Sequence, residues 1–162
     1  MLEDSAEPGR KTALTVRVVS CDAKVIGSLV GGCRVTVRHA ISGDVLARGL
    51  HRGGSGDTDR IMNLPHGRGD LVYGTEGTAS CRFEFPLDQP TPVEVIAEGP
   101  LAFPQALQRA STTTWLIPGE HVEGEGLLLQ LQGFIVEVMK PPAVEVFHPG
   151  QPLDLEASVR LL

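Results

Sequence analysis

The sequence predicts an all-β protein, built as an antiparallel two-sheet β-sandwich with at most one short helix. Apolar and polar residues alternate with a period of two in most patterned segments, whereas the period of an amphipathic helix is almost absent. The 19 glycines and 12 prolines divide the chain into short segments separated by turns. Because the strand faces are half polar, antiparallel sheets are favoured over parallel ones, whose strands are apolar on both faces.

Length and composition fit one domain of ordinary size. The chain has 162 residues, of which 41% are hydrophobic, enough for a core without disulfide or metal support. We expect residues 1–11 to form a flexible tail and residues 12–162 to form a single sandwich domain. Cys21, Cys33 and Cys81 are too few and too widely spaced for a zinc site or a dense disulfide framework, so free or buried thiols are expected, with a Cys21–Cys33 bridge left open.

The first strands follow the tail. Residues 14–18 form a short alternating segment, and a hairpin is predicted from residues 34–38, the turn 42–44 and residues 45–50. Gly43 supplies the positive φ that a tight connection requires, and the β-branched flanks suit pleated strands.

A long connection is expected next, over residues 51–77. This segment is rich in Gly, Asp, Asn and Pro, so we expect at most one short strand in it, near Arg60–Leu64. Loops longer than about fifteen residues in compact domains are usually functional or disordered. A functional site is therefore sought here first.

Alternation returns in the second half of the chain. Residues 79–85 place Cys81, Phe83 and Phe85 on one face, and proline can open one or two helical turns at Pro104. Further strands are predicted over residues 91–97 and 112–117.

The last third of the chain contains a change of parity. The inward positions of residues 127–139 switch at Gly133, which predicts one strand with a β-bulge at that glycine. After the Pro141–Pro142 break, residues 143–147 form a short extended segment. Residues 153–161 then show the clearest alternation in the chain.

Two segments resemble known sandwich families. Gly31–Val37 (GGCRVTV) followed by Ser42–Gly49 (SGDVLARG) resembles the strand-turn-strand signature of carboxypeptidase-regulatory-like, or transthyretin-like, domains. In that family the second strand leads through a short turn into another strand, whereas here the long 51–77 loop intervenes. Pro149–Leu155 (PGQPLDL) resembles the late turn and strand of immunoglobulin-like domains. Both resemblances imply a sandwich, and neither implies a reaction.

Charge and hydropathy exclude several classes of partner. The net charge is −6 and the basic residues are scattered singly, so neither a nucleic-acid surface nor a membrane-binding surface is expected. The longest apolar stretch, residues 127–139, is too short and too interrupted to cross a bilayer. The polar first residues lack a signal peptide, which predicts a cytoplasmic location, with export in a complex left open.

The 51–77 loop contains the best candidates for a metal site. Asp57 and Asp59 lie two residues apart in a glycine-rich stretch and could offer oxygen ligands to a hard cation, with His51 and His66 nearby. The EF-hand order is absent, and an Asp-Gly turn is more often only a turn. The glycines also lack the Lys and Ser/Thr of a phosphate loop, so no cofactor is expected.

Catalytic motifs are missing from the sequence. There is no Gly-x-Ser-x-Gly elbow, and no cysteine shares a motif with a histidine. We therefore expect no enzyme but a non-catalytic protein-interaction or accessory domain, such as a small structural subunit of a larger complex, with a protein partner or a homo-oligomer. The alternative is a metal- or small-ligand-binding β-sandwich module that uses the 51–77 loop.

Overall fold

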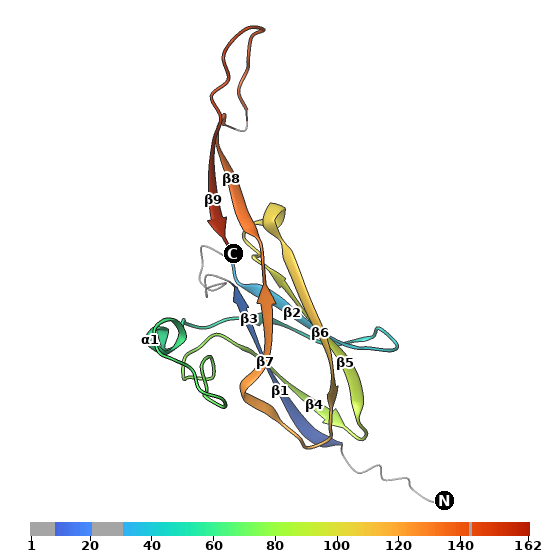
Figure 1. Ribbon diagram of the computed structural model, residues 1–162. Helices are drawn as coiled ribbons and strands as arrows, with labels where there is room; N and C mark the ends of the chain where they lie inside the picture. Colours follow the sequence, from blue (N-terminus) through green and yellow to red (C-terminus); the bar gives the residue numbers. More distant parts are fainter. Residues whose placement is uncertain (1–8, 21–30, 143) are drawn as a thin grey trace, which may run out of the picture.

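A computed structural model describes residues 9–20, 31–142 and 144–162. The described chain is all-β, with nine strands, one short α-helix and one 3-10 turn (Figure 1). Residues 1–8 of the predicted tail, Cys21 of the possible bridge and Ala143 lie outside the described residues. The strands are β1 (Arg10–Ser20), β2 (Cys33–His39), β3 (Val45–His51), β4 (Cys81–Leu87), β5 (Thr91–Gly99), β6 (Gln108–Leu116), β7 (Val122–Leu131), β8 (Phe134–Lys140) and β9 (Glu156–Leu161), and the helical elements are α1 (Thr58–Met62) and the 3-10 turn η1 (Pro104–Ala106).

The strands form two larger sheets and one separate hairpin. One sheet has the order β4-β1-β7, the second has the order β3-β2-β5-β6, and β8 pairs with β9. Neighbouring strands are antiparallel except β1 and β7, which run parallel. The first strand of the described chain is thus inserted between β4 and β7.

The two larger sheets share one hydrophobic core. Buried side chains of both sheets belong to a single cluster, in which Leu14 and Val16 of β1 join Val35 of β2 and Val95 of β5. These four side chains are fully buried, as expected where alternate residues of two sheets face each other. The predicted all-β, sandwich-like class is confirmed.

Most predicted strands are found at their predicted places. The hairpin is β2 and β3, with Gly43 at a φ of 79° in the turn, and residues 79–85 and 91–97 correspond to β4 and β5. The helical turn expected at Pro104 is η1. β1 is longer than residues 14–18 because it is a central strand with neighbours on both edges, and it takes in Arg10 and Lys11 of the predicted tail.

The short strand expected near Arg60–Leu64 is wrong, since α1 occupies this position. Asp57 is the N-cap of the helix, and its Oδ1 accepts a hydrogen bond from the Arg60 backbone N–H at 3.0 Å. An aspartate at this position satisfies an amide that would otherwise lack a partner, which favours helix over strand.

The bulge expected at Gly133 is also wrong. β7 ends at Leu131 and β8 begins at Phe134, in a different sheet. The parity of the apolar residues changes because the chain leaves one sheet for another. The buried residues Leu129, Leu131 and Ile135 keep one parity, so no extra residue is inserted into a single strand. Gly133 has a φ of 152°, in the region that favours glycine, and makes this transition possible.

β8 and β9 form an arm that projects from the sandwich (Figure 1). We use the name arm for β8, β9 and the residues between them. Of the strand predicted over residues 153–161, only the part that forms β9 is a strand. Residues 144–155 of the described chain contain no strand. The arm is anchored at its base, where Ile135 and Leu162 are both 4% exposed and the Leu162 N–H donates to the Gly133 carbonyl at 2.8 Å.

Candidate functional site

The two aspartates predicted as metal ligands serve the short helix in the 51–77 loop. Asp57 caps α1, and Asp59 Oδ1 accepts a hydrogen bond from Asn63 Nδ2 at 3.0 Å, one turn further along. Both carboxylates are exposed and engaged in local hydrogen bonds. Their two-residue spacing is explained by helix capping.

The two predicted histidine ligands lie in different environments. His66 is exposed, with Nε2 against the Arg60 carbonyl, whereas His51 is 2% exposed. Within the described residues, no group of three or more His, Cys, Asp or Glu side chains could hold a metal ion. The geometry gives the four predicted residues no common coordination site.

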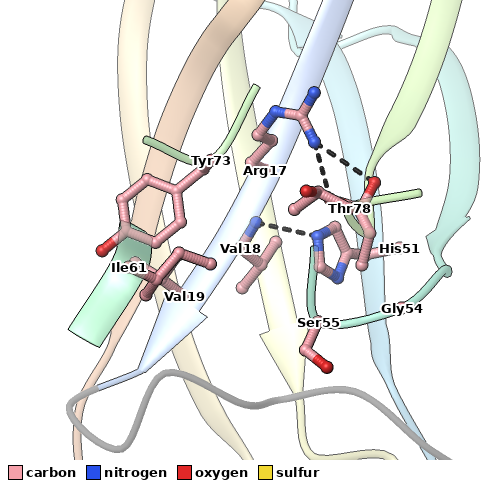
Figure 2. Close-up of a pocket in the computed structure, with 10 residues that line it drawn as sticks. Arg17, Val18, Val19, His51, Gly54, Ser55, Ile61, Tyr73 and Thr78 are labelled. Atoms are coloured by element: carbon pink, nitrogen blue, oxygen red, sulfur yellow. Dashed lines mark hydrogen bonds between the residues drawn. The ribbon is translucent and has the colours of Figure 1, made fainter. Parts of the chain in front are cut away.

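His51 completes the hydrogen bonding of the central strand β1. β4 begins at Cys81, which lies opposite Val16 of β1. The next backbone N–H of β1 that points toward β4 is that of Val18, and no residue of β4 lies opposite it. His51 Nε2 accepts that hydrogen bond at 3.1 Å (Figure 2). A side chain thus replaces the missing strand, and a buried backbone donor is satisfied.

A second histidine does the same at the opposite edge of β1. The pairing with β7 begins at Leu14, opposite Val122, and the Ala13 N–H next to it donates to His121 Nδ1 at 3.0 Å. Imidazole nitrogens therefore act as hydrogen-bond acceptors at one end of the pairing of β1 with β4 and at one end of its pairing with β7. Each can do so only while that ring nitrogen is unprotonated.

The environment keeps the His51 ring neutral. Burial lowers the pKa of His51 to about 4, and the Arg17 charge acts in the same direction while the Ala79 backbone opposes it. Since Nε2 accepts from Val18, the ring proton is assigned to Nδ1. Nδ1 has no hydrogen-bond partner of normal geometry.

Arg17 ties the end of the 51–77 loop to the sheet. Its guanidinium Nη1 donates to the carbonyls of Thr78 at 3.3 Å and Ala79 at 3.1 Å, and Nη2 donates to Gly124 at 3.2 Å. Burial lowers the pKa of Arg17, and the nearby charge of Glu125 opposes this. A buried cation is tolerated here because three backbone acceptors surround it.

The same loop is held at other points. Its ends pair through two isolated bridges, Arg52 with Ser80 and Gly54 with Thr78. Glu125 of β7 accepts the backbone N–H groups of Tyr73 at 3.0 Å and of Gly74 at 2.8 Å. The loop therefore forms a layer over the outer face of β1 near Arg17 and Val19, which contributes to the burial of this end of the strand on both faces.

A small cavity lies beneath this layer. Its volume is about 20 Å³, and Arg17, His51, Ser55, Ile61 and Tyr73 are among the side chains that line it (Figure 2). A space of this size holds about one water molecule. Arg17 and His51 are directed to backbone groups of the fold, which is a structural role.

A larger cavity, of about 230 Å³, lies on the outer side of β1 and β4. Its charged lining residues are Lys11, Arg82 and Glu84. Arg82 pairs with Glu84 at 3.6 Å and with Glu123 at 2.8 Å, so its charge is already compensated. None of the residues that line it comes from the 51–77 loop.

The arm presents an apolar face to solvent. Phe134, Val136 and Val138 of β8 lie opposite Leu161, Val159 and Ala157 of β9, so the six side chains share one face of the hairpin. We call these six residues the arm face. Its large side chains are exposed by 47–68%.

The opposite face of the arm carries the polar groups. Ile135 lies opposite Arg160 and Glu137 opposite Ser158, and Arg160 hydrogen-bonds to Glu137. The Arg160 guanidinium also lies 5.2 Å from the centre of the Phe103 ring, in a cation–π contact with the sandwich. The face opposite the arm face thus contacts the sandwich, and the arm face points away from it.

The arm face is the surface that sequence reasoning did not identify as a site. Its signal was present, since the alternation of residues 153–161 and of residues 134–138 marks one apolar side in each strand. Alternation alone does not tell whether that side meets the core of the same chain. Eleven of the twenty-two large apolar side chains that are exposed in the described chain lie between residues 134 and 161.

Known proteins provide no guide to the function of these surfaces. Comparisons with protein-family models, curated proteins and solved structures find no match to this chain. Among the described residues, no helix is both long enough and apolar enough to span a bilayer.

Proposed function

We propose that this chain is a non-catalytic protein-interaction or accessory domain, and that the arm face is its binding surface. The observation that carries this proposal is the orientation of the arm. Its polar face contacts the sandwich at the base, through Ile135 and Arg160, whereas the apolar side chains of the arm face point to solvent. Folding alone favours the reverse orientation, so the apolar face requires another explanation.

The size of the exposed apolar surface supports a binding role. At about 120 Å² for a fully exposed Val or Leu side chain and about 200 Å² for Phe, the arm face leaves roughly 400 Å² of apolar surface in water. The largest patch on a typical monomer measures about 300–600 Å² and is often functional. The apolar side chains between β8 and β9, such as Val144 and Val146, which are 91% and 79% exposed, extend this surface toward the tip.

The architecture of the arm leads to the same proposal. A two-stranded hairpin is marginally stable in water unless a third strand or a packed layer covers it. Here only the base of the arm is covered, through Ile135, Arg160 and Leu162. A partner protein seated on the arm face supplies the missing layer.

Photo-cross-linking in cells tests the proposal. A photoreactive residue at Val138, on the arm face, should give one discrete cross-linked product. The matched control is Ser158, which belongs to the same hairpin but to its opposite face. The proposal is contradicted if Val138 gives no discrete product, or if both positions give the same products.

Two further expectations from the sequence remain predictions. These are the cytoplasmic location and the resemblance to transthyretin-like or immunoglobulin-like domains. The grouping of the strands in two sheets around one core supports the resemblance only at the level of a sandwich-like fold.

A further inference from the structure

We infer that the partner of the arm face is the arm face of a second copy of this chain, so that two arms pack face to face around a two-fold axis. This inference rests on the proposed function and specifies its partner. It follows from the order of side-chain sizes along the arm, from the charges around the face, and from the available area.

The sizes of the side chains along the arm face make it complementary to itself. The Phe134–Leu161 pair is large, the Val136–Val159 pair is intermediate, and the Val138–Ala157 pair is small. A two-fold axis that lies between the two arms and crosses the strands at the middle pair reverses the strand direction. It therefore places the large end of one arm on the small end of the other. Facing layers that alternate large and small residues pack well, at the usual distance of about 10 Å between sheets.

The charges allow two identical faces to meet. The six side chains of the arm face are uncharged, and Lys140 next to them pairs with Glu156 at 2.7 Å and lies 3.8 Å from Asp154. Arg160 pairs with Glu137 on the other side of the hairpin. Contact between two copies therefore buries no unpaired charge of these groups, and like charges are not brought face to face.

The area fits a weak dimer. A standard interface buries about 800 Å² per partner, and smaller interfaces are typical of transient contacts. The arm face presents roughly 400 Å² of apolar surface per copy, so association is expected toward the submillimolar end of concentration. Because the arm projects from the sandwich, two arms can meet while the acidic bodies, with net charge −6 per chain, remain apart (Figure 1).

Sedimentation velocity on the purified full chain, from micromolar to submillimolar concentration, tests the inference. The wild type should form a dimer, and Val136→Asp should weaken it by about 30-fold or more, as expected for a central interface residue. Val159→Asp, on the other strand, should do the same. Ile41→Asp is the matched control, because Ile41 is 82% exposed and belongs to the turn between β2 and β3, away from the arm.

A size swap provides a test that is specific to two identical arms. Ala157→Phe enlarges the small end, so it should weaken the dimer. Adding Phe134→Ala to the same chain reduces the large end and should restore much of the affinity. Thermal unfolding of each variant verifies that the sandwich is intact, since all the substituted residues are exposed.

The outcomes separate this inference from the proposed function. A chain that stays monomeric at submillimolar concentration, while Val138 cross-links to a different protein, overturns the inference and leaves the proposed function standing. A monomer without any discrete cross-link at Val138 overturns both. A dimer that survives Val136→Asp and is lost with Ile41→Asp overturns the inference, because the dimer then uses another surface.

Discussion

Acid should destabilise the fold through His51. The pKa of His51 is about 4 in the folded chain, against an ordinary value of 6.5. Between these two values the unfolded chain binds the proton and the folded chain does not, so the free energy of unfolding falls as pH decreases from 6.5 to 4. Above pH 6.5 the ring is neutral in both states and contributes no pH dependence. At about 1.4 kcal/mol for each pH unit, the expected loss is on the order of 3 kcal/mol.

The structural cause of this loss can be separated from the titration of other groups. Protonation of Nε2 removes the acceptor of the Val18 N–H and places a cation near Arg17. In His51→Gln, the amide oxygen can accept the same hydrogen bond but does not titrate. The variant should therefore lose much less stability between pH 6.5 and 4, even if it is less stable at pH 7.

Urea unfolding of both proteins at several pH values measures the effect. We subtract the free energy of unfolding of His51→Gln from that of the wild type at each pH. As pH falls from 6.5 to 4, this difference should decrease by about 3 kcal/mol, so that it shrinks or changes sign. Exposed carboxylates titrate equally in the two proteins and cancel in the comparison. Parallel curves for the two proteins would refute the assigned role of His51.

Three other predictions concern the loop layer and the core. Arg17→Met should lower the free energy of unfolding by about 2–4 kcal/mol, since three backbone carbonyls lose their donor, as measured by urea unfolding. Asp57→Ala should remove about 1 kcal/mol from α1 alone, which appears as faster amide exchange in the helix with an unchanged melting temperature. In a Cys21→Ser background, the thiols of Cys33 and Cys81 should react with an aromatic disulfide reagent only after unfolding, because burial raises the pKa of both, that of Cys33 to about 12.

Each of these predictions has a result that contradicts it. Unchanged urea unfolding of Arg17→Met would show that the loop is held by other contacts. A lower melting temperature for Asp57→Ala would mean that α1 belongs to the cooperative core. Rapid labelling of the native thiols would show that the core opens without global unfolding.

The sandwich-like class was predictable because alternation depends on the sequence alone. Residues such as Cys81, Phe83 and Phe85 occupy every second position of β4 and lie in the core as expected. The parity change at Gly133 was visible but ambiguous. A bulge within one strand and a transition between two sheets produce the same pattern, and only the strand pairing distinguishes them.

The role of His51 could not be predicted in the same way. It depends on the point at which β4 begins relative to β1, where Cys81 lies opposite Val16, and these residues are about 65 positions apart in the chain. The aspartates of the loop were identified as polar groups at a close spacing, which fits a helix cap as well as a metal site. The orientation of the arm depends on how its base packs, through Ile135 and Arg160.

The parallel pairing of β1 with β7 also bears on how the chain acquires its fold. Ala13 and His121, which are hydrogen-bonded at the edge of this pair, are separated by 108 residues. Sheet β3-β2-β5-β6 can assemble from closer segments, whereas β1 waits for one of its two neighbours until most of the chain has been synthesised. During that interval β1, which is buried along most of its length in the folded chain, lacks its neighbouring strand β7. Unpaired apolar strands of this kind are prone to aggregation. The slow step of folding and the main risk of misfolding are thus expected at the insertion of the same strand.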